Sequence, residues 1–176
     1  SESDDAGEGF LAEVCQRWED AAMQAPDDVR TVTLRTGQVI SPFGGFLAKQ
    51  RPLVKFGLGG PMGSGHQYLS WISLRDHVRS MITALTNDDI RGPVNLVAPN
   101  PVSNAEFIAA YAGSMKRPHF MPFPTPAAKL LFGGQLIEEA LLAGQRVRSD
   151  MLAGVGFEFH DPTITDAIAQ AAQGRH

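Results

Sequence analysis

The chain has 176 residues, which suggests one domain, and 43% of them are hydrophobic, enough to form a core. The formal net charge of −4 argues against a nucleic-acid-binding protein, because phosphate contacts need a surplus of Lys and Arg. No apolar run approaches the roughly 20 residues of a membrane-spanning helix. The single cysteine, Cys15, excludes an internal disulfide and fits a cytoplasmic protein.

The first part of the chain predicts a helix, a strand and a short helical turn. The helix is expected over residues 10–23, where apolar side chains recur every three or four positions: Leu11, Val14, Cys15, Trp18, Ala21 and Ala22. We expect this face to be buried, with Cys15 as a small apolar residue rather than a nucleophile, because no basic group is placed beside it. The alternation over 29–35 predicts a strand, and residues 46–50 predict one helical turn.

A glycine-rich stretch at 56–76 is the strongest local feature. Five glycines between Gly57 and Gly65 allow the backbone to approach a ligand closely. Residues 68–72 then predict a short strand, and Ser73 with Asp76 predicts the start of a helix. Two interpretations remain open: a ligand-facing loop, or a long surface connection whose glycines only form turns.

The rest of the chain alternates helices and strands. The helix over 74–86 is expected to bury Val78, Met81, Ile82 and Leu85, with Arg75 and Arg79 on its outer side. A strand is expected over 94–98. Further helices are expected to begin at Ser103, Thr125, Gln135, Ser149 and Ile164.

This order, with few hairpin signals, predicts an α/β fold with parallel strands. Only three or four strands are convincing. We therefore expect part of a larger sheet, with an edge that another segment or a second copy of the chain covers.

Five segments in this order resemble the C-terminal part of extended short-chain dehydrogenase/reductases: RTGQVISP (35–42), GLGGPMGSG (57–65), WISLRDHVRSM (71–81), GPVNLVAPNPVSNAEF (92–107) and GFEFHDP (156–162). Within that family the chain is most similar to the atypical NAD-dependent epimerase/dehydratase-like, cell-division-inhibitor-like subgroup. The resemblance implies a Rossmann-type parallel sheet plus a small α-rich substrate lobe. Residues 1–56 and 67–98 would be late Rossmann elements around the loop 57–65, and 99–176 mainly substrate-lobe and C-terminal helices. The N-terminal cofactor half is expected to be absent from this chain.

The resemblance also carries departures from the family pattern. Family members bind NAD or NADP through a TGxxGxxG turn, which this sequence lacks, so no cofactor is expected on this chain alone. The catalytic Tyr-x-x-x-Lys, aligned on Glu19, becomes Leu11 and Cys15, which cannot supply the acid/base and the cation of that mechanism. Where nucleotide-sugar epimerases have R-D-F-I-H-V-D-D, the phosphate-clamping arginine becomes Leu69.

The resemblance implies the following candidate site. Arg35 would contact the nicotinamide or the substrate, with an ion pair at a strand end as the alternative. Substrate contacts would come from Gly59, Gly60, Met62, His66 and Arg75. No catalytic residue is assigned, and no metal site is expected.

The sequence thus indicates the substrate-side portion of an NAD(P)-dependent sugar-epimerase/dehydratase-like oxidoreductase whose catalytic motif is not intact. We expect this chain alone to be inactive. Its partners would be a small-molecule substrate and the N-terminal Rossmann half, with a homodimer as a further option and neither nucleic acid nor membrane. The alternative is a non-catalytic ligand-binding or protein-interaction module on the same fold.

Overall fold

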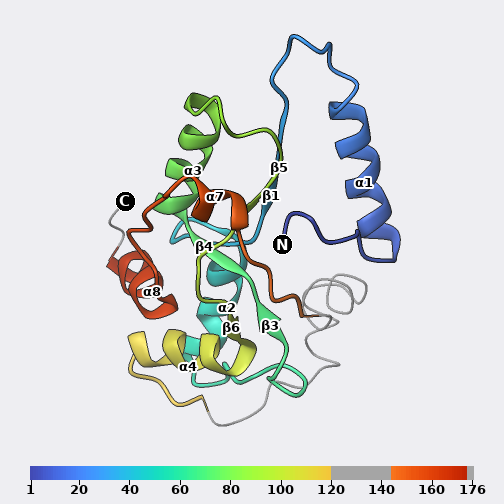
Figure 1. Ribbon diagram of the computed structural model, residues 1–176. Coiled ribbons are helices and arrows are strands. Elements are labelled where there is room, and N and C mark those ends of the chain that lie inside the picture. The colour runs from blue at the N-terminus through green and yellow to red at the C-terminus, as the bar shows by residue number, and fades with distance from the viewer. Residues whose placement is uncertain (120–143, 174–176) are drawn as a thin grey trace.

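The computed structural model describes residues 1–119 and 144–173 (Figure 1). These residues form an α/β fold in which two of three two-stranded sheets are parallel. β1 (Val32–Thr36) pairs in parallel with β5 (Gly92–Leu96), and β2 (Gln38–Ile40) pairs in parallel with β4 (Trp71–Ser73). β3 (Tyr68–Leu69) pairs antiparallel with β6 (Val102–Ser103). The helices that were expected to begin at Thr125 and Gln135 lie outside the described residues.

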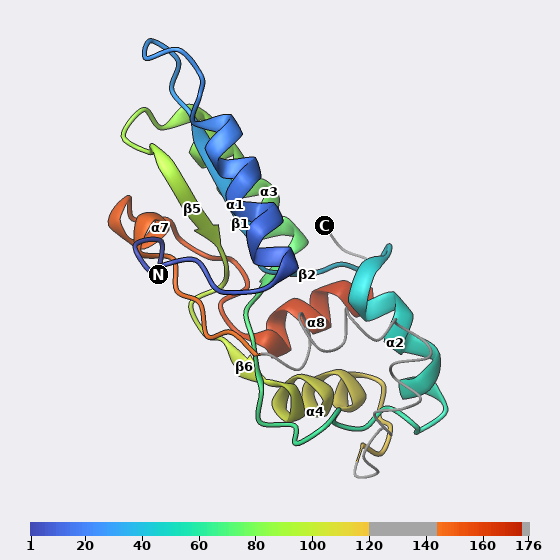
Figure 2. The same ribbon diagram turned by 90° about the vertical axis from the view of Figure 1, so that its right-hand side faces the viewer.

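Six helices accompany these strands in the described residues. They are α1 (Phe10–Ala22), α2 (Gly45–Lys55), α3 (Leu74–Thr86), α4 (Asn104–Ser114), α7 (Asp150–Gly154) and α8 (Ile164–Gln173). Figures 1 and 2 show α1 and α3 on opposite sides of β1, with α2, α4 and α8 grouped at the other end of the molecule. No described helix is both long and apolar enough to cross a bilayer.

Three helix starts confirm the capping patterns in the sequence. The Ser73 hydroxyl accepts a hydrogen bond from the Asp76 amide at 3.2 Å, and Ser149 accepts one from Leu152 at 3.3 Å. Ser103 and Glu106 form both halves of a capping box, which fixes the first turn of α4.

The strand expected at 68–72 is divided in two at Ser70. β3 and β4 pair with different partners, β6 and β2, so the chain changes sheets at this residue. Gly37 marks a similar change between β1 and β2: its amide donates to Leu96 O, and that of Gln38 donates to Ser70 O. A Cβ at Gly37 would lie 2.8 Å from Ser70 O, so only glycine fits at this crossing.

α2 is longer than the single turn that the sequence predicted. Its interior contains Pro52, which ends most helices because it lacks an amide proton. Here the helix continues to Lys55 because Phe46, Leu47 and Val54 on one face are buried in the core. The Tyr111 hydroxyl of α4 also donates to Leu47 O at 3.0 Å and ties the two helices together.

Two apolar cores divide the molecule. We call the first part the lobe. It consists of α2, α4, α8 and the paired strands β3 and β6, and its core includes Phe46, Phe107, Ile108 and Ile168. We call the second part the sheet unit: it consists of β1, β5, α3 and α7, and its core includes Ile72, Ile90, Val94, Leu96 and Leu152. The β2–β4 pair joins them, because it contributes Ile40 and Trp71 to the first core and Ile72 to the second.

The apolar faces of two helices are not buried, contrary to the sequence-based expectation. α3 exposes Val78, Met81, Ile82 and Leu85, and it buries Asp76, Ser80 and Ala84 instead. The predicted outer residues Arg75 and Arg79 are only partly exposed and make ion pairs.

α1 has no buried residue, and Cys15 is exposed rather than buried. The periodicity identified the apolar faces correctly, but the described chain supplies nothing that covers them.

Candidate functional site

The glycine-rich loop is held against the N-terminus of α4 by a set of specific hydrogen bonds. The buried Asn104 side chain accepts from the Met62 amide at 2.8 Å, and its own amide donates to Gln67 O at 2.9 Å. The Gln67 side chain donates to Met62 O at 2.8 Å, and the Ala105 amide donates to Gly65 O. The loop is therefore a fixed part of the lobe, and α4 determines its shape.

Three of the predicted substrate contacts lie inside this packed loop. Gly59, Gly60 and Met62 are buried, and Met62 belongs to the lobe core. A Cβ at Gly59 would lie 2.4 Å from Val54 Cγ2 and 2.9 Å from Val54 Cα, so a side chain there would displace α2. Gly59 is thus required for close packing of the loop on α2, a role that the sequence did not separate from ligand contact.

His66 and Arg75, the two predicted cationic contacts, are not brought together by a shared partner. His66 is exposed, and its amide donates to Ser64 Oγ at 3.3 Å. Arg75 makes an ion pair with Asp161, Nη2 to Oδ1 at 2.8 Å. Within the described residues, Arg75 Nε and Asp161 Oδ2 are both buried and make no hydrogen bond.

Asp76 does more than begin α3. Its carboxylate is fully buried and accepts hydrogen bonds from the His160 amide at 3.0 Å and the Asp161 amide at 2.8 Å. Arg79 of the next helical turn neutralises it at 2.9 Å. This carboxylate therefore holds the 158–161 segment against α3, which the capping pattern alone could not reveal.

Arg35 takes the ion-pair alternative in this structure. Its Nε and Nη2 donate to the two carboxylate oxygens of Glu19, each at 2.7 Å, which connects α1 to β1. The hydrogen bonds from Arg35 lower the pKa of Glu19, so the pair remains ionised. This bidentate pairing occupies the face of the guanidinium that a ligand would otherwise use.

Glu2 is a structural anchor that the sequence did not identify. Its carboxylate accepts from the amides of Asn95 and Asp150, each at 3.0 Å, and from the Ser149 hydroxyl at 3.2 Å. Burial alone would raise the pKa of Glu2, but the backbone amide donors lower it below its ordinary value. No sequence pattern linked residue 2 to residues 149–151, because nothing local encodes a contact over that separation.

Thr36 and His77 lie at the carboxyl end of β1, where α/β proteins place their ligands. The Thr36 hydroxyl and His77 Nε2 are 3.2 Å apart. Burial lowers the pKa of His77, so its imidazole is neutral at pH 7. A neutral imidazole beside a hydroxyl can exchange a proton, and no spacing in the sequence pairs these two residues.

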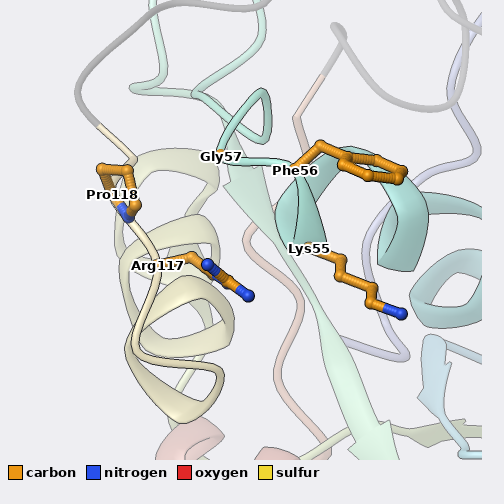
Figure 3. Close-up of a pocket in the computed structure, with 5 residues that line it drawn as sticks. All are labelled: Lys55, Phe56, Gly57, Arg117 and Pro118. Carbon is orange, nitrogen blue, oxygen red and sulfur yellow. The ribbon is translucent and has the colours of Figure 1, made fainter.

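A hollow of about 330 Å³ lies between the end of α2 and the segment after α4. It is lined by Lys55, Phe56, Gly57, Arg117 and Pro118 (Figure 3). Figure 3 shows that the Lys55 side chain extends away from Arg117, so the two cations do not converge on one point. In the described ranges, no three His, Cys, Asp or Glu side chains are close enough to hold a metal ion.

Comparisons with known proteins show what this chain is similar to. Residues 123–171 match the family described as Domain of unknown function (DUF1731). The chain is 46% identical over 171 residues to the epimerase family protein MT2273 of Mycobacterium tuberculosis, covering 97% of this chain and 56% of that protein. Thus it spans about half the length of such relatives.

Two solved structures are similar over almost the whole chain. The human epimerase family protein SDR39U1 (isoform 2), crystallised with NADPH, matches with a TM-score of 0.87 and 32% identity, over 94% of this chain and 56% of that one. A nucleoside-diphosphate sugar epimerase from Corynebacterium glutamicum matches with a TM-score of 0.77 and 33% identity, over 97% and 32%. The chain is thus similar to epimerase family proteins over nearly all of its length, and these matches agree with its parallel α/β fold.

Proposed function

We propose that this chain forms the substrate side of an NAD(P)-dependent, epimerase/dehydratase-like oxidoreductase. The observation that carries the proposal is the likeness to the human protein crystallised with NADPH, which extends over 94% of this chain. The activity, substrate and partners of a whole protein remain part of the proposal, since the chain corresponds to 56% of that structure. We also place the protein in the cytoplasm as part of this proposal.

The residues described do not by themselves fit a dinucleotide. The sequence contains no TGxxGxxG turn, and Arg35, the single candidate for the cofactor side, is bonded to both oxygens of Glu19. We therefore assign NAD or NADP to the whole protein and derive no reaction step through it. What this chain offers the reaction is a rigid loop and the Thr36–His77 pair at the carboxyl end of β1.

The substrate of the proposed enzyme is a small polar molecule. Among the predicted substrate contacts, His66 is exposed and Arg75 is partly exposed, so both side chains can reach a bound molecule. Gly59, Gly60 and Met62 would act by fixing the loop that carries His66, since all three are buried. Leu69, which stands in place of the phosphate-clamping arginine, is itself buried and adds no charge to this region.

A non-catalytic ligand-binding or protein-interaction module is the second candidate. The observation that favours it is on α1, where Leu11 and Cys15 occupy the positions that the family resemblance gives to the catalytic Tyr and Lys. Neither side chain can carry out proton transfer in the way of that pair. An enzyme would need an acid or base from elsewhere, and His77 is the candidate within the described residues.

Fluorescence titration with NADPH and NADH tests the proposal. The probe proteins are this chain alone and this chain grafted into human SDR39U1 in place of the region that it matches. We expect no saturable binding to the chain alone and binding by the graft within about tenfold of the human protein. A folded graft that binds neither cofactor would contradict the oxidoreductase proposal and favour the binding module. Micromolar binding by the chain alone would contradict the assignment of the cofactor site to the whole protein.

A further inference from the structure

The cationic side chains of the protein are paired unevenly. Six arginines make ion pairs with carboxylates: Arg17, Arg30, Arg35, Arg75, Arg79 and Arg148. Arg146 lies over the Tyr68 ring, with Cζ 5.2 Å from the ring centroid. Within residues 1–119 and 144–173, the remaining Lys and Arg side chains make no hydrogen bond or ion pair: Lys49, Arg51, Lys55, Arg91, Lys116 and Arg117. All of these except Arg91 belong to α2 or to the segment that follows α4.

Four of the unpaired cations form one exposed surface of the lobe, which we call the basic patch: Arg51, Lys55, Lys116 and Arg117. Arg51 and Lys55 are four residues apart on α2 and therefore lie on the same face of the helix. Lys55 and Arg117 line the same hollow, so the end of α2 and the segment after α4 are neighbours (Figure 3). Neither residues 29–75 nor residues 107–119 contain an Asp or Glu that would neutralise the patch.

Helix capping does not explain the basic patch. At the end of α2, the Leu53 carbonyl accepts from the Leu58 amide at 2.8 Å. At the end of α4, the Ala112 carbonyl accepts from the Arg117 amide at 2.9 Å. Backbone amides therefore already cap these carbonyls, and no Lys or Arg side chain is needed as their donor.

Lys116 occupies a backbone position that favours glycine. Its φ is 54°, and among the described residues it is the one non-glycine residue with a positive φ. A lysine is strained in this conformation, whereas glycine adopts it freely. Strained residues are often kept for a functional reason, and here the strain retains a cation beside Arg117.

The hollow beside the basic patch has room for an apolar side chain. It measures about 330 Å³, and Phe56, Gly57 and Pro118 contribute carbon surface to its lining. Phe56 is 77% exposed. A Cβ at Gly57 would lie 3.3 Å from Pro118 Cγ, so a side chain at residue 57 would narrow the hollow. The absence of a side chain there keeps the hollow open.

The cations lie around this hollow and do not meet inside it. Because the Lys55 side chain extends away from Arg117 (Figure 3), the patch does not form a cradle for one compact anion such as a single phosphate. Carboxylates spaced along a peptide would reach both cations. Arginine and aromatic side chains are also the types that are enriched at the centres of protein interfaces.

We propose that the basic patch is a docking surface for an acidic segment of another protein, and that this segment places an aromatic or aliphatic side chain in the hollow. Complementary charge would guide the partner to the patch, and burial of the apolar side chain would hold it there. This inference concerns a protein partner, and it holds whether or not the protein is an oxidoreductase.

Two other occupants fit the surface less well. A bilayer would meet a hollowed surface rather than a flat or protruding one, and the formal net charge of −4 opposes the approach of a polyphosphate. The acidic residues 1–28 of a second copy have the right sign of charge. Two of their carboxylates are already engaged, however: that of Glu2 by the Asn95 amide and that of Glu19 by Arg35.

Fluorescence anisotropy tests the docking surface. The probe is a short fluorescein-labelled peptide of Asp and Glu with one central Phe, titrated with the 176-residue chain. We expect saturable binding below about 1 mM that weakens as the ionic strength rises. Lys55→Glu and Arg117→Glu should each weaken it by about tenfold or more. A peptide with Ala in place of Phe should also bind several-fold more weakly, because the hollow would be left unfilled.

Arg91→Glu is the matched control, because it makes the same change in charge at an exposed, unpaired arginine outside the lobe. It should change the affinity by less than about twofold. Lys116→Gly separates binding from stability: it should weaken binding while the melting temperature stays the same or rises, since glycine relieves the strained φ. Circular dichroism of each variant should match that of the unaltered chain.

Several outcomes would overturn the proposal. These are absence of peptide binding, an equal effect of Arg91→Glu, and equal affinity for the Phe and Ala peptides. Binding to phosphatidylserine vesicles but not to the peptide would assign the patch to a membrane instead. A dimer in light scattering that Lys55→Glu dissociates would assign it to a second copy. A lower melting temperature for Lys116→Gly would give Lys116 a structural role.

Discussion

The lobe and the sheet unit handle their apolar residues in opposite ways. The lobe covers its core with its own helices, so that Phe107, Tyr111 and Ile168 are almost completely buried. The sheet unit has a smaller core and leaves the apolar face of α3 exposed, and the apolar face of α1, which adjoins β1, is exposed as well. The difference shows that helical periodicity identifies an apolar face but does not reveal whether the same chain covers it.

Truncating one large apolar residue in each part gives the largest contrast. Phe107→Ala should lower the free energy of unfolding by about 3–5 kcal/mol, because Phe107 is 1% exposed and packs against Phe46. Leu85→Ala in α3 should change it by less than about 0.5 kcal/mol, because Leu85 is 75% exposed. Urea denaturation of the 176-residue chain measures both. Similar losses in the two variants would show that the sheet unit is as closed as the lobe.

Asp76 tests the connection between α3 and the segment that leads into the lobe helix α8. Asp76→Asn should lower the free energy of unfolding by roughly 2–4 kcal/mol, because the amide NH₂ replaces a buried acceptor that faces donors. Asp88→Asn, at an exposed side chain, is the matched control and should have little effect. Equal stability of the two variants in a denaturant titration would mean that the 158–161 segment is held by other contacts.

Glu2 tests the contacts that join the N-terminal segment to β5 and to the start of α7. Glu2→Gln should lower the free energy of unfolding by roughly 1 kcal/mol at pH 7, because the amide keeps one acceptor and loses the charge. The native pKa of Glu2 is lowered from 4.5, so its stabilisation is present above pH 4.5 and is lost as the pH falls through the native value. The unaltered chain should therefore lose stability more steeply than the variant in that acidic range. Parallel pH profiles would argue against the anchor.

His77 gives the smallest expected effect. Burial lowers its pKa from 6.5, so the unfolded chain takes up a proton first, and stability falls as the pH decreases from 6.5. His77→Gln should flatten the stability profile below pH 6.5 by a few tenths of a kcal/mol. An NMR titration of the His77 imidazole protons measures the shift directly. A pKa of 6.5 or above for His77 would contradict the partly buried contact with Thr36.

Local chemistry explains which parts of the fold the sequence could predict. Ser73, Ser103 and Ser149 marked helix starts correctly because a cap depends on residues three positions apart. The orientation of α3 was wrong because burial depends on neighbours that the sequence pattern does not identify. α2 continues past the single turn predicted over 46–50 because its apolar face is buried in the core, which the local sequence does not reveal.

The candidate site shows the same limit. The loop was identified from its glycines, but one anchor that shapes it, Asn104, comes from α4, and the other, Gln67, follows the loop and donates back to Met62 O. Arg35 was recognised as a candidate, whereas its pairing with Glu19 depends on how α1 meets β1. The Thr36–His77 pair was missed because the two residues are 41 positions apart and only the fold brings them together.

The bond from Ser149 to Glu2 joins residues 147 positions apart, and it has a consequence for the order of events during synthesis. Glu2 leaves the ribosome 147 residues before Ser149, so its acceptor oxygens can reach Ser149 and Asp150 only after the intervening chain has emerged. The outer edge of β5 therefore stays unprotected through much of translation. Because long-range closure of this kind is slow and exposed edges invite aggregation, we expect chaperones to engage this edge before its last contacts form.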